Sequence, residues 1–231
     1  SVSQNTHTFL QYLNAVNVTT RESKVDDFAH FALTVCGFKE HDSLIHERHW
    51  ISLWICGEEK SAEANVCMVD PDTKMIQVIK ENKAARNIQS PEPQVIAEAI
   101  SAFQHNNHIR QSMGLPALAQ MTLLRITMVG THPAFYLVPV TNVLNNAVLN
   151  GTYPLSRTRV QRCRCEVVGV NGGVENPAYR THALQYYVAF RVLAKRCFPF
   201  NTPYASCFVS PLIVKEVIPY PVFQIFTHND M

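Results

Sequence analysis

Apolar residues recur every three or four positions in three stretches of the chain, a spacing typical of helices that pack one face against a core. The first stretch covers residues 23–36 and stops at Gly37, a residue suited to the position after a helix. The second begins near Pro91, and the third follows Pro177. Proline fits the first turn of a helix, so both of these stretches can begin a helix at their proline. Together with residues 23–36, they predict three substantial helices. A short apolar turn is expected at residues 9–13 and a short helix at residues 142–149.

Runs rich in β-branched and aromatic residues lie between the helical stretches and predict strands. The runs cover residues 49–56, 62–69, 75–83, 122–129 and 134–140. Asp70-Pro71-Asp72 supplies turn residues between the second and third runs. Residues 150–173 carry a weak signal, and the tail after residue 198 suggests strands or extended packing segments. Up to residue 140 the order is helix, three strands, helix, two strands, which predicts an α/β fold with a mixed sheet.

The composition fits one compact unit. With 231 residues, 47% hydrophobic and 16% charged, the chain can bury a sizeable core. We therefore expect a single domain over residues 1–231. Its core covers about residues 20–140, and residues 141–231 form a C-terminal extension of helical and extended segments packed on that core.

Charge and cysteine content bear on the partners of the protein and on its cellular compartment. A net charge of +2 does not by itself indicate a nucleic-acid partner. The seven cysteines cannot all pair, and their spacing lacks the pattern of a zinc site, so reduced thiols in an intracellular protein, cytoplasmic or nuclear, are expected. The alternative of a secreted protein whose leader was removed stays open. No apolar run approaches the roughly 18 residues that span a bilayer, so no membrane partner is expected.

The third strand run ends in Glu81-Asn82-Lys83. Residues two apart in a strand share a face, so Glu81 and Lys83 point the same way and Asn82 points the other way. Phosphodiester cleavage with Mg²⁺ or Mn²⁺ needs oxygen ligands, a positioned water and a cation near the phosphate. Glu81 suits a metal ligand, the backbone carbonyl of Asn82 a further ligand, and Lys83 the cation. Charged strand ends are common, so this motif alone is a weak signal.

Residues 20–140 resemble the PD-(D/E)XK nuclease superfamily. The similarity rests on the order of elements, the third-strand motif at 76–83 and the following helix with Gln94. A narrower likeness over residues 51–103 rests on Ile-Cys-Gly at 55–57, Ala-Glu-Ala-Asn-Val-Cys at 62–67 and Pro-Glu-Pro-Gln at 91–94. The stretch is also similar to uncharacterised fungal proteins of that type. The resemblance implies a restriction-endonuclease-like core: helix, three antiparallel strands, helix, strand.

The same resemblance implies a function, namely Mg²⁺- or Mn²⁺-dependent hydrolysis of nucleic acid, with DNA ahead of RNA. It places an acid on the second strand, the (D/E)xK motif on the third and a supporting glutamine on the following helix. On this chain Asn65, Glu81, Lys83 and Gln94 stand at those positions. A homodimer is left open.

Asn65 departs from the superfamily, which has an aspartate there, and an amide is a poorer ligand for a hard dication. Three explanations of Asn65 stay open. The protein is a natural pseudo-nuclease, or its aspartate was replaced to trap an inactive state, or another residue has taken over the role of metal ligand. Glu63 shares the face of Asn65 and is the first candidate for a moved ligand, or else a solvated strand residue. Asp26 and Asp27 are further carboxylates, although Asp26 also fits a capping box with Ser23.

The densest basic segment holds four arginines: Arg157, Arg159, Arg162 and Arg164. They suit contacts with a phosphate backbone, or they form an ordinary solvated face. This segment supports the rival hypothesis of a non-catalytic pseudo-nuclease that binds nucleic acid or protein.

Three residue pairs have spacings that permit metal binding. They are His46 and His49, His105 and His108, and Cys163 and Cys165. Ordinary packing or loop positions explain each pair as well, and no second pair lies nearby in the sequence.

Overall fold

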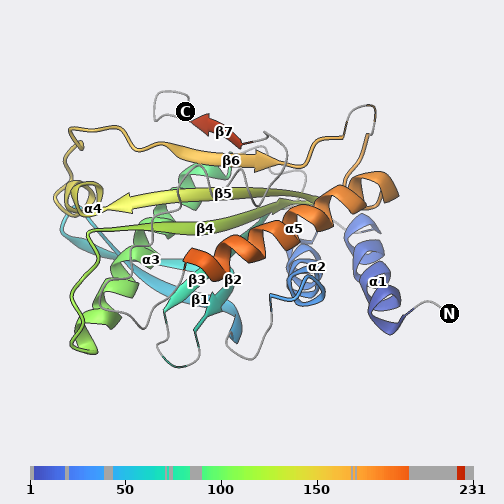
Figure 1. The fold of residues 1–231 in the computed structure, drawn as a ribbon, viewed down its shortest axis with the longest axis horizontal. Helices are drawn as coiled ribbons and strands as arrows, with labels where there is room; N and C mark the ends of the chain where they lie inside the picture. Colours follow the sequence, from blue (N-terminus) through green and yellow to red (C-terminus); the bar gives the residue numbers. More distant parts are fainter. Residues whose placement is uncertain are drawn as a thin grey trace.

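The computed structural model describes residues 3–18, 21–38, 44–70, 72, 75–83, 90–167, 169, 171–197 and 223–226. The helices are α1 (Gln4–Val18), α2 (Glu22–Val35), α3 (Glu92–Ser112), α4 (Asn142–Leu149) and α5 (Pro177–Cys197). The strands are β1 (Leu44–Ile55), β2 (Glu58–Val69), β3 (Ile76–Lys83), β4 (Gln120–Val129), β5 (His132–Thr141), β6 (Val160–Arg164) and β7 (Phe223–Phe226). Figure 1 shows their arrangement.

The described strands form one mixed sheet in the order β1-β2-β3-β4-β5-β6-β7. Neighbouring strands are antiparallel except β3 and β4, which are parallel. A parallel pair needs a crossover, and α3 provides it. The predicted α/β fold with a helix, three strands, a helix and a further strand is therefore confirmed.

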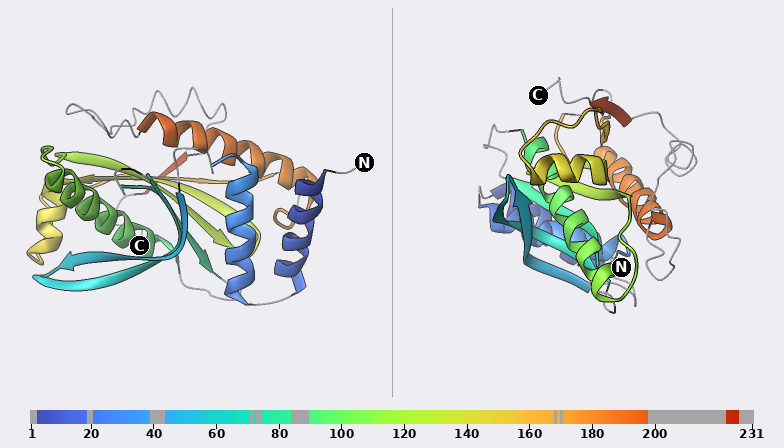
Figure 2. Two further views of the ribbon diagram at one scale, coloured as in Figure 1. Left: turned by 90° about the horizontal axis from the view of Figure 1, so that it is seen from below. Right: turned by 90° about the vertical axis from the view of Figure 1, so that its left-hand side faces the viewer.

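Helices α3 and α5 cover opposite faces of the sheet at β5. Consecutive strand residues point to opposite faces, and Phe135 contacts Tyr187 of α5 with ring centroids 5.0 Å apart, while the Tyr136 hydroxyl reaches Glu92 of α3. Tyr187 and Phe190 are buried, so both belong to the core and not to an exposed stacking surface. Figure 2 shows α5 and α3 on the two sides of the sheet.

The long β1–β2 hairpin curls past α3 (Figure 2). Its turn consists of Cys56 and Gly57, both with positive φ angles of 53° and 76°, as a two-residue turn between twisted strands requires. The Gln104 side chain of α3 accepts a hydrogen bond from the Trp54 backbone N–H and donates one to its carbonyl, at 2.8 and 3.0 Å. These bonds occupy backbone groups of β1, a strand at the end of the sheet order.

The structure differs from the sequence prediction in three respects. The turn expected at residues 9–13 is a full helix, α1, whose Phe9 packs on Phe28 of α2 at 5.2 Å. The weak region 150–173 contains strand β6, which was missed. Strands β6 and β7 extend the same sheet, so part of the predicted C-terminal extension completes the sheet begun by the core.

Among the described residues, no helix combines the length and the apolar character that crossing a membrane would require.

Candidate functional site

The register of β2 and β3 brings the predicted hairpin positions together. Val66 lies opposite Lys80, and Cys67 lies opposite Ile79. Continuing this antiparallel register by one residue sets Asn65 opposite Glu81, and by two more sets Glu63 opposite Lys83. The side chains of residues 77–83 lie outside the described part of the chain, so these are relationships between backbone positions.

Strand β4 lies on the other side of the motif. In the parallel pairing, Glu81 is beside Thr127 and Lys83 is beside Val129, while Asn82 is beside Met128. Two rows of neighbouring residues can be followed across β3, β4 and β5, and the first of them continues into β6. The Glu81 row contains Glu81, Thr127, Ala134 and Arg164, and the Lys83 row contains Lys83, Val129 and His132.

Asn65 is half-buried and contacts helix α2. Its Nδ2 donates a hydrogen bond of 3.0 Å to Oδ1 of Asp26. Helix α2 begins at Glu22 after Arg21 and has no side-chain cap, so the predicted capping box of Ser23 and Asp26 is wrong. Asp26 is instead joined to the strand position where the superfamily resemblance implies an acid.

Asp27 has a different environment from Asp26. Its carboxylate forms a part-exposed ion pair with Lys24 at 2.9 Å. Glu63, the other candidate for a moved ligand, is half-buried on β2.

Gln94 lies on α3 and connects to β4 through a second residue. Its Nε2 donates to Oε1 of Glu98 at 3.0 Å, and Glu98 forms an ion pair with Arg125. Both charged side chains are only 1% exposed. Arg125 is beside Ile79 of β3, two residues before Glu81. Gln94 is thus linked to the sheet through Arg125, two positions along β4 from Thr127 of the Glu81 row.

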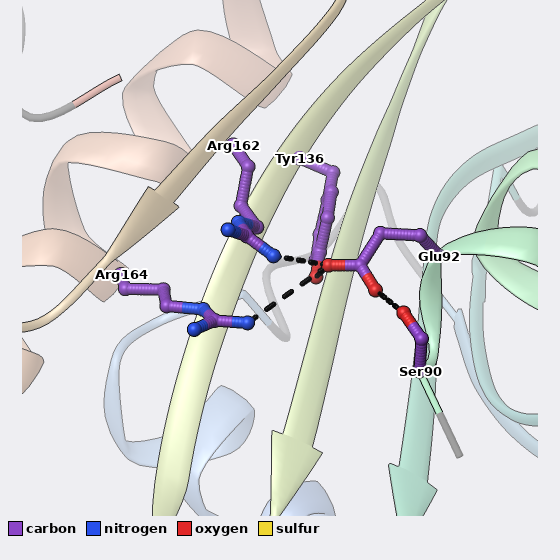
Figure 3. A network of polar contacts seen from close by, with 5 residues as sticks. All are labelled: Ser90, Glu92, Tyr136, Arg162 and Arg164. Carbon is purple, nitrogen blue, oxygen red and sulfur yellow. Dashed lines mark hydrogen bonds and ion pairs between the residues drawn. The ribbon is translucent and has the colours of Figure 1, made fainter. Parts of the chain in front are cut away.

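Glu92, in the first turn of α3, is the centre of a second buried network (Figure 3). Its carboxylate accepts hydrogen bonds from Ser90 and from Tyr136, the latter at 3.0 Å, and pairs with Arg162. The Arg164 guanidinium lies 4.0 Å from the same Oε1 atom. Strands β5 and β6 and the start of α3 therefore meet at one carboxylate.

The hydrogen bonds decide the charge state of Glu92. Burial raises the pKa of its carboxyl, but the bonds from Ser90, its own backbone, Arg162 and Tyr136 outweigh burial, so the pKa is lowered below the ordinary glutamate value. Burial, and then the charge of Glu92, raise the pKa of Tyr136 to about 12. At neutral pH Glu92 is an anion and Tyr136 is a neutral donor.

The four predicted arginines divide into three environments. Arg157 and Arg159 are exposed on the segment before β6. Arg162 is buried in its pair with Glu92, so a phosphate contact by this side chain would require breaking that pair. The Arg164 side chain, on the same strand, is 52% exposed.

A cavity of about 360 Å³ opens beside the two rows. Thr127, Ala134 and Arg164 of the Glu81 row line it, together with Val129 and His132 of the Lys83 row. The remaining lining residues are Pro91, Pro133, Tyr136, Cys165, Glu166 and Tyr179. Part of the cavity lining therefore comes from β4, the strand paired with β3.

The other predicted metal-binding pairs do not form a complete site. The ring centroid of His49 lies 5.6 Å from that of His46 and 6.4 Å from that of His105 on α3, whereas His108 is exposed. Burial first, then His46 and His105, lower the pKa of His49. Within the described ranges no three His, Cys, Asp or Glu side chains are arranged to hold a metal ion.

Cys163 and Cys165 are buried free thiols. Burial is the main cause that raises their pKa values to about 12 and about 11. Both thiols are therefore protonated at neutral pH, and both lie in the packed core.

Sequence reasoning missed the buried charges that surround the site. Glu98 and Arg125 pair across α3 and β4, and Glu92 pairs with Arg162 across α3 and β6. The available signal was a charged residue inside an apolar run, as in Leu-Leu-Arg-Ile around Arg125, because such a residue is buried only when it has a partner.

Comparisons with known proteins assign no family. No protein-family model and no curated protein matches the sequence. Among solved structures, the fold is similar to the type IIG restriction endonuclease BpuSI, with a TM-score of 0.41 and 11% sequence identity. The alignment covers 74% of this chain and 17% of that chain, so this chain matches a small part of the larger protein.

Proposed function

We propose that this protein binds nucleic acid and hydrolyses its phosphodiester bonds with the help of Mg²⁺ or Mn²⁺. The observation that carries the proposal is the strand register. It sets the backbone of Glu81 and Lys83 beside Thr127 and Val129, two residues that line the cavity, and its continuation sets Asn65 opposite Glu81.

The residues near Asn65 fit a hard divalent cation. Asn65 donates through Nδ2 to Asp26, so its Oδ1 is turned to another direction, and the Asp26 carboxylate supplies a second kind of oxygen ligand. In this proposal Glu81, the Asn82 carbonyl, Asn65 and Asp26 hold the ion, with Glu63 as the alternative acid. A bound ion would lower the pKa of a water molecule and polarise a phosphate oxygen.

The remaining roles belong to residues of the chain itself. Lys83 positions the attacking water and offsets charge that develops on the phosphate. Gln94 supports the site indirectly, because its partner Glu98 is paired with Arg125 on the strand next to β3.

The test is a cleavage assay with purified protein on single- and double-stranded DNA and RNA, with Mg²⁺ or Mn²⁺. We expect metal-dependent cleavage that Lys83→Ala abolishes and that Lys60→Ala, at an exposed lysine of β2, leaves unchanged. Asn65→Asp should increase the rate, because a carboxylate binds these ions better than an amide. The hydrolase proposal is rejected if neither the wild type nor Asn65→Asp cuts any of the substrates.

One observation favours a second candidate, a pseudo-nuclease that binds nucleic acid without cutting it. The Asn65 amide already donates to Asp26 and so occupies one oxygen of a carboxylate that a metal would need. This candidate expects nucleic-acid binding that weakens with salt and does not depend on Mn²⁺. Binding measured in EDTA and in Mn²⁺ separates the two candidates.

A further inference from the structure

We propose that the cavity beside the Glu81 and Lys83 rows binds the phosphorylated end of a nucleic-acid strand, with Arg164 as its phosphate ligand. The inference rests on the proposed function for the class of ligand. It adds a recognition site and a preference for strand ends.

The charge balance around Glu92 leaves Arg164 able to bind an anion. Glu92 carries one negative charge and faces two guanidinium groups, those of Arg162 and Arg164. Arg162 is buried in the closer pair, while Arg164 is 4.0 Å away and half exposed. The three side chains together carry a net charge of about +1, and the exposed part of that charge lies on Arg164 at the cavity. A guanidinium matches the geometry of a phosphate in a bidentate contact.

The walls of the cavity suit a base and sugar. Tyr179 and His132 both line it, and their rings are in edge contact with centroids 5.6 Å apart. His132 is exposed and offers a ring on which a base can stack regardless of sequence, while Tyr179 is buried behind it. Pro91, Pro133 and Val129 provide further apolar surface. A volume of about 360 Å³ falls near the lower limit for small-ligand sites, roughly 300–1,000 Å³, and suits one nucleotide.

A carboxylate limits the cavity to a strand end. Glu166 lines the cavity and is exposed, so it repels a second phosphate near the one held by Arg164. A continuous strand would bring several phosphates past this residue. A terminal nucleotide continues into the strand on one side only, so fewer phosphates pass Glu166, and the Glu81 row places that nucleotide next to the proposed catalytic strand.

The experiment measures binding without cleavage. Internally labelled oligonucleotides of one sequence, with a 5′-phosphate, a 3′-phosphate or hydroxyls at both ends, are titrated with protein in EDTA. For the wild type, a phosphate at one end should tighten binding roughly tenfold over hydroxyl ends. Arg164→Gln should lose this gain, and Lys60→Gln, at an exposed lysine of β2, should keep it. The end that gives the gain identifies which phosphate the cavity accepts.

Two results overturn the inference: no gain from a phosphate at either end, or a gain that survives in Arg164→Gln. Should Arg164→Gln fail to fold, competition on the wild type decides. A nucleoside monophosphate should displace the phosphorylated strand and the nucleoside should not, and equal competition by both contradicts the assignment. Because no step requires hydrolysis, end-dependent binding without cleavage rejects only the hydrolase, and cleavage without end-dependent binding rejects only this site.

Discussion

The Asn65 amide of β2 donates a hydrogen bond of 3.0 Å to the Asp26 carboxylate of α2. This bond joins the first helix of the predicted core to the strand position where the resemblance implies a metal-binding acid. Residue 65 therefore takes part in a contact between α2 and β2, and its identity also bears on whether the site can bind a metal ion.

Replacing Asn65 by aspartate should make stability depend on metal. The change removes the N–H donor and sets two carboxylates side by side, which costs about 1–3 kcal/mol and several degrees of Tm. Mn²⁺ should raise the Tm of Asn65→Asp more than that of the wild type, because a cation between the carboxylates relieves their repulsion. Thermal unfolding with and without Mn²⁺ measures both effects.

Asn14→Asp, at an exposed position of α1, is the control for the added charge. Equal Tm values for Asn65→Asp and Asn14→Asp, in both conditions, would contradict the role given to the contact with Asp26.

Asn106 should anchor the start of β3. Its fully buried side chain accepts from the Ile76 N–H at 2.7 Å and donates to the Ile76 carbonyl at 2.9 Å. Asn106→Ala removes both bonds, each worth about 1–3 kcal/mol when buried partners lose them. We expect faster hydrogen exchange in the first residues of β3, the strand that leads to Glu81.

The control for this variant is Gln111→Ala, at an exposed position of the same helix. Unchanged exchange in β3 of Asn106→Ala would show that the strand is held by other contacts.

The Glu98–Arg125 pair should matter more to stability than Gln94. Glu98→Ala deprives a buried guanidinium of its carboxylate partner and should lower the free energy of unfolding by about 3–5 kcal/mol. Gln94→Ala removes a hydrogen bond and should cost about 0.5–1.5 kcal/mol. Urea denaturation of both variants gives the comparison. Equal costs would argue against the pair as the main link between α3 and β4.

The stability that Glu92 contributes should be lost in acid. Its folded pKa is lowered, so its contribution is fully present above the pKa of the unfolded chain, about 4.3, and is lost as the pH falls through the folded value. Glu92→Gln should therefore be less stable than the wild type at neutral pH, and the difference should shrink below about pH 4.3.

Denaturation curves at several pH values test this, with Glu59→Gln at an exposed position as control. A difference between wild type and Glu92→Gln that stays constant or widens on acidification would contradict the network drawn around Glu92.

Local signals were enough to predict most elements. Asp70-Pro71-Asp72 predicted the turn before β3, and Pro177 predicted the start of α5. The Oδ1 of Asn176, just before that helix, accepts from the Ala178 N–H at 2.9 Å. The length of helix α1 was predicted too short, because the helix depends on packing against α2, as the contact between Phe9 and Phe28 shows. Tertiary contacts of this kind leave no periodic signal of their own.

Strand β6 was missed because its arginines resemble a solvated loop. Arg162 is buried only because Glu92, 70 residues earlier in the chain, neutralises it. The cavity has the same origin, since its lining comes from α3, β4, β5, β6 and α5. The sequence could predict the strand with Glu81 and Lys83, but not the partners that the sheet brings beside it.

The most direct test of the proposed hydrolase is a calorimetric titration with Mn²⁺. The proposal predicts binding by the wild type that Glu81→Ala abolishes and that Glu59→Ala, at an exposed glutamate of β2, retains. No heat of binding for the wild type, or binding that Glu81→Ala leaves unchanged, would contradict a metal site at the end of β3.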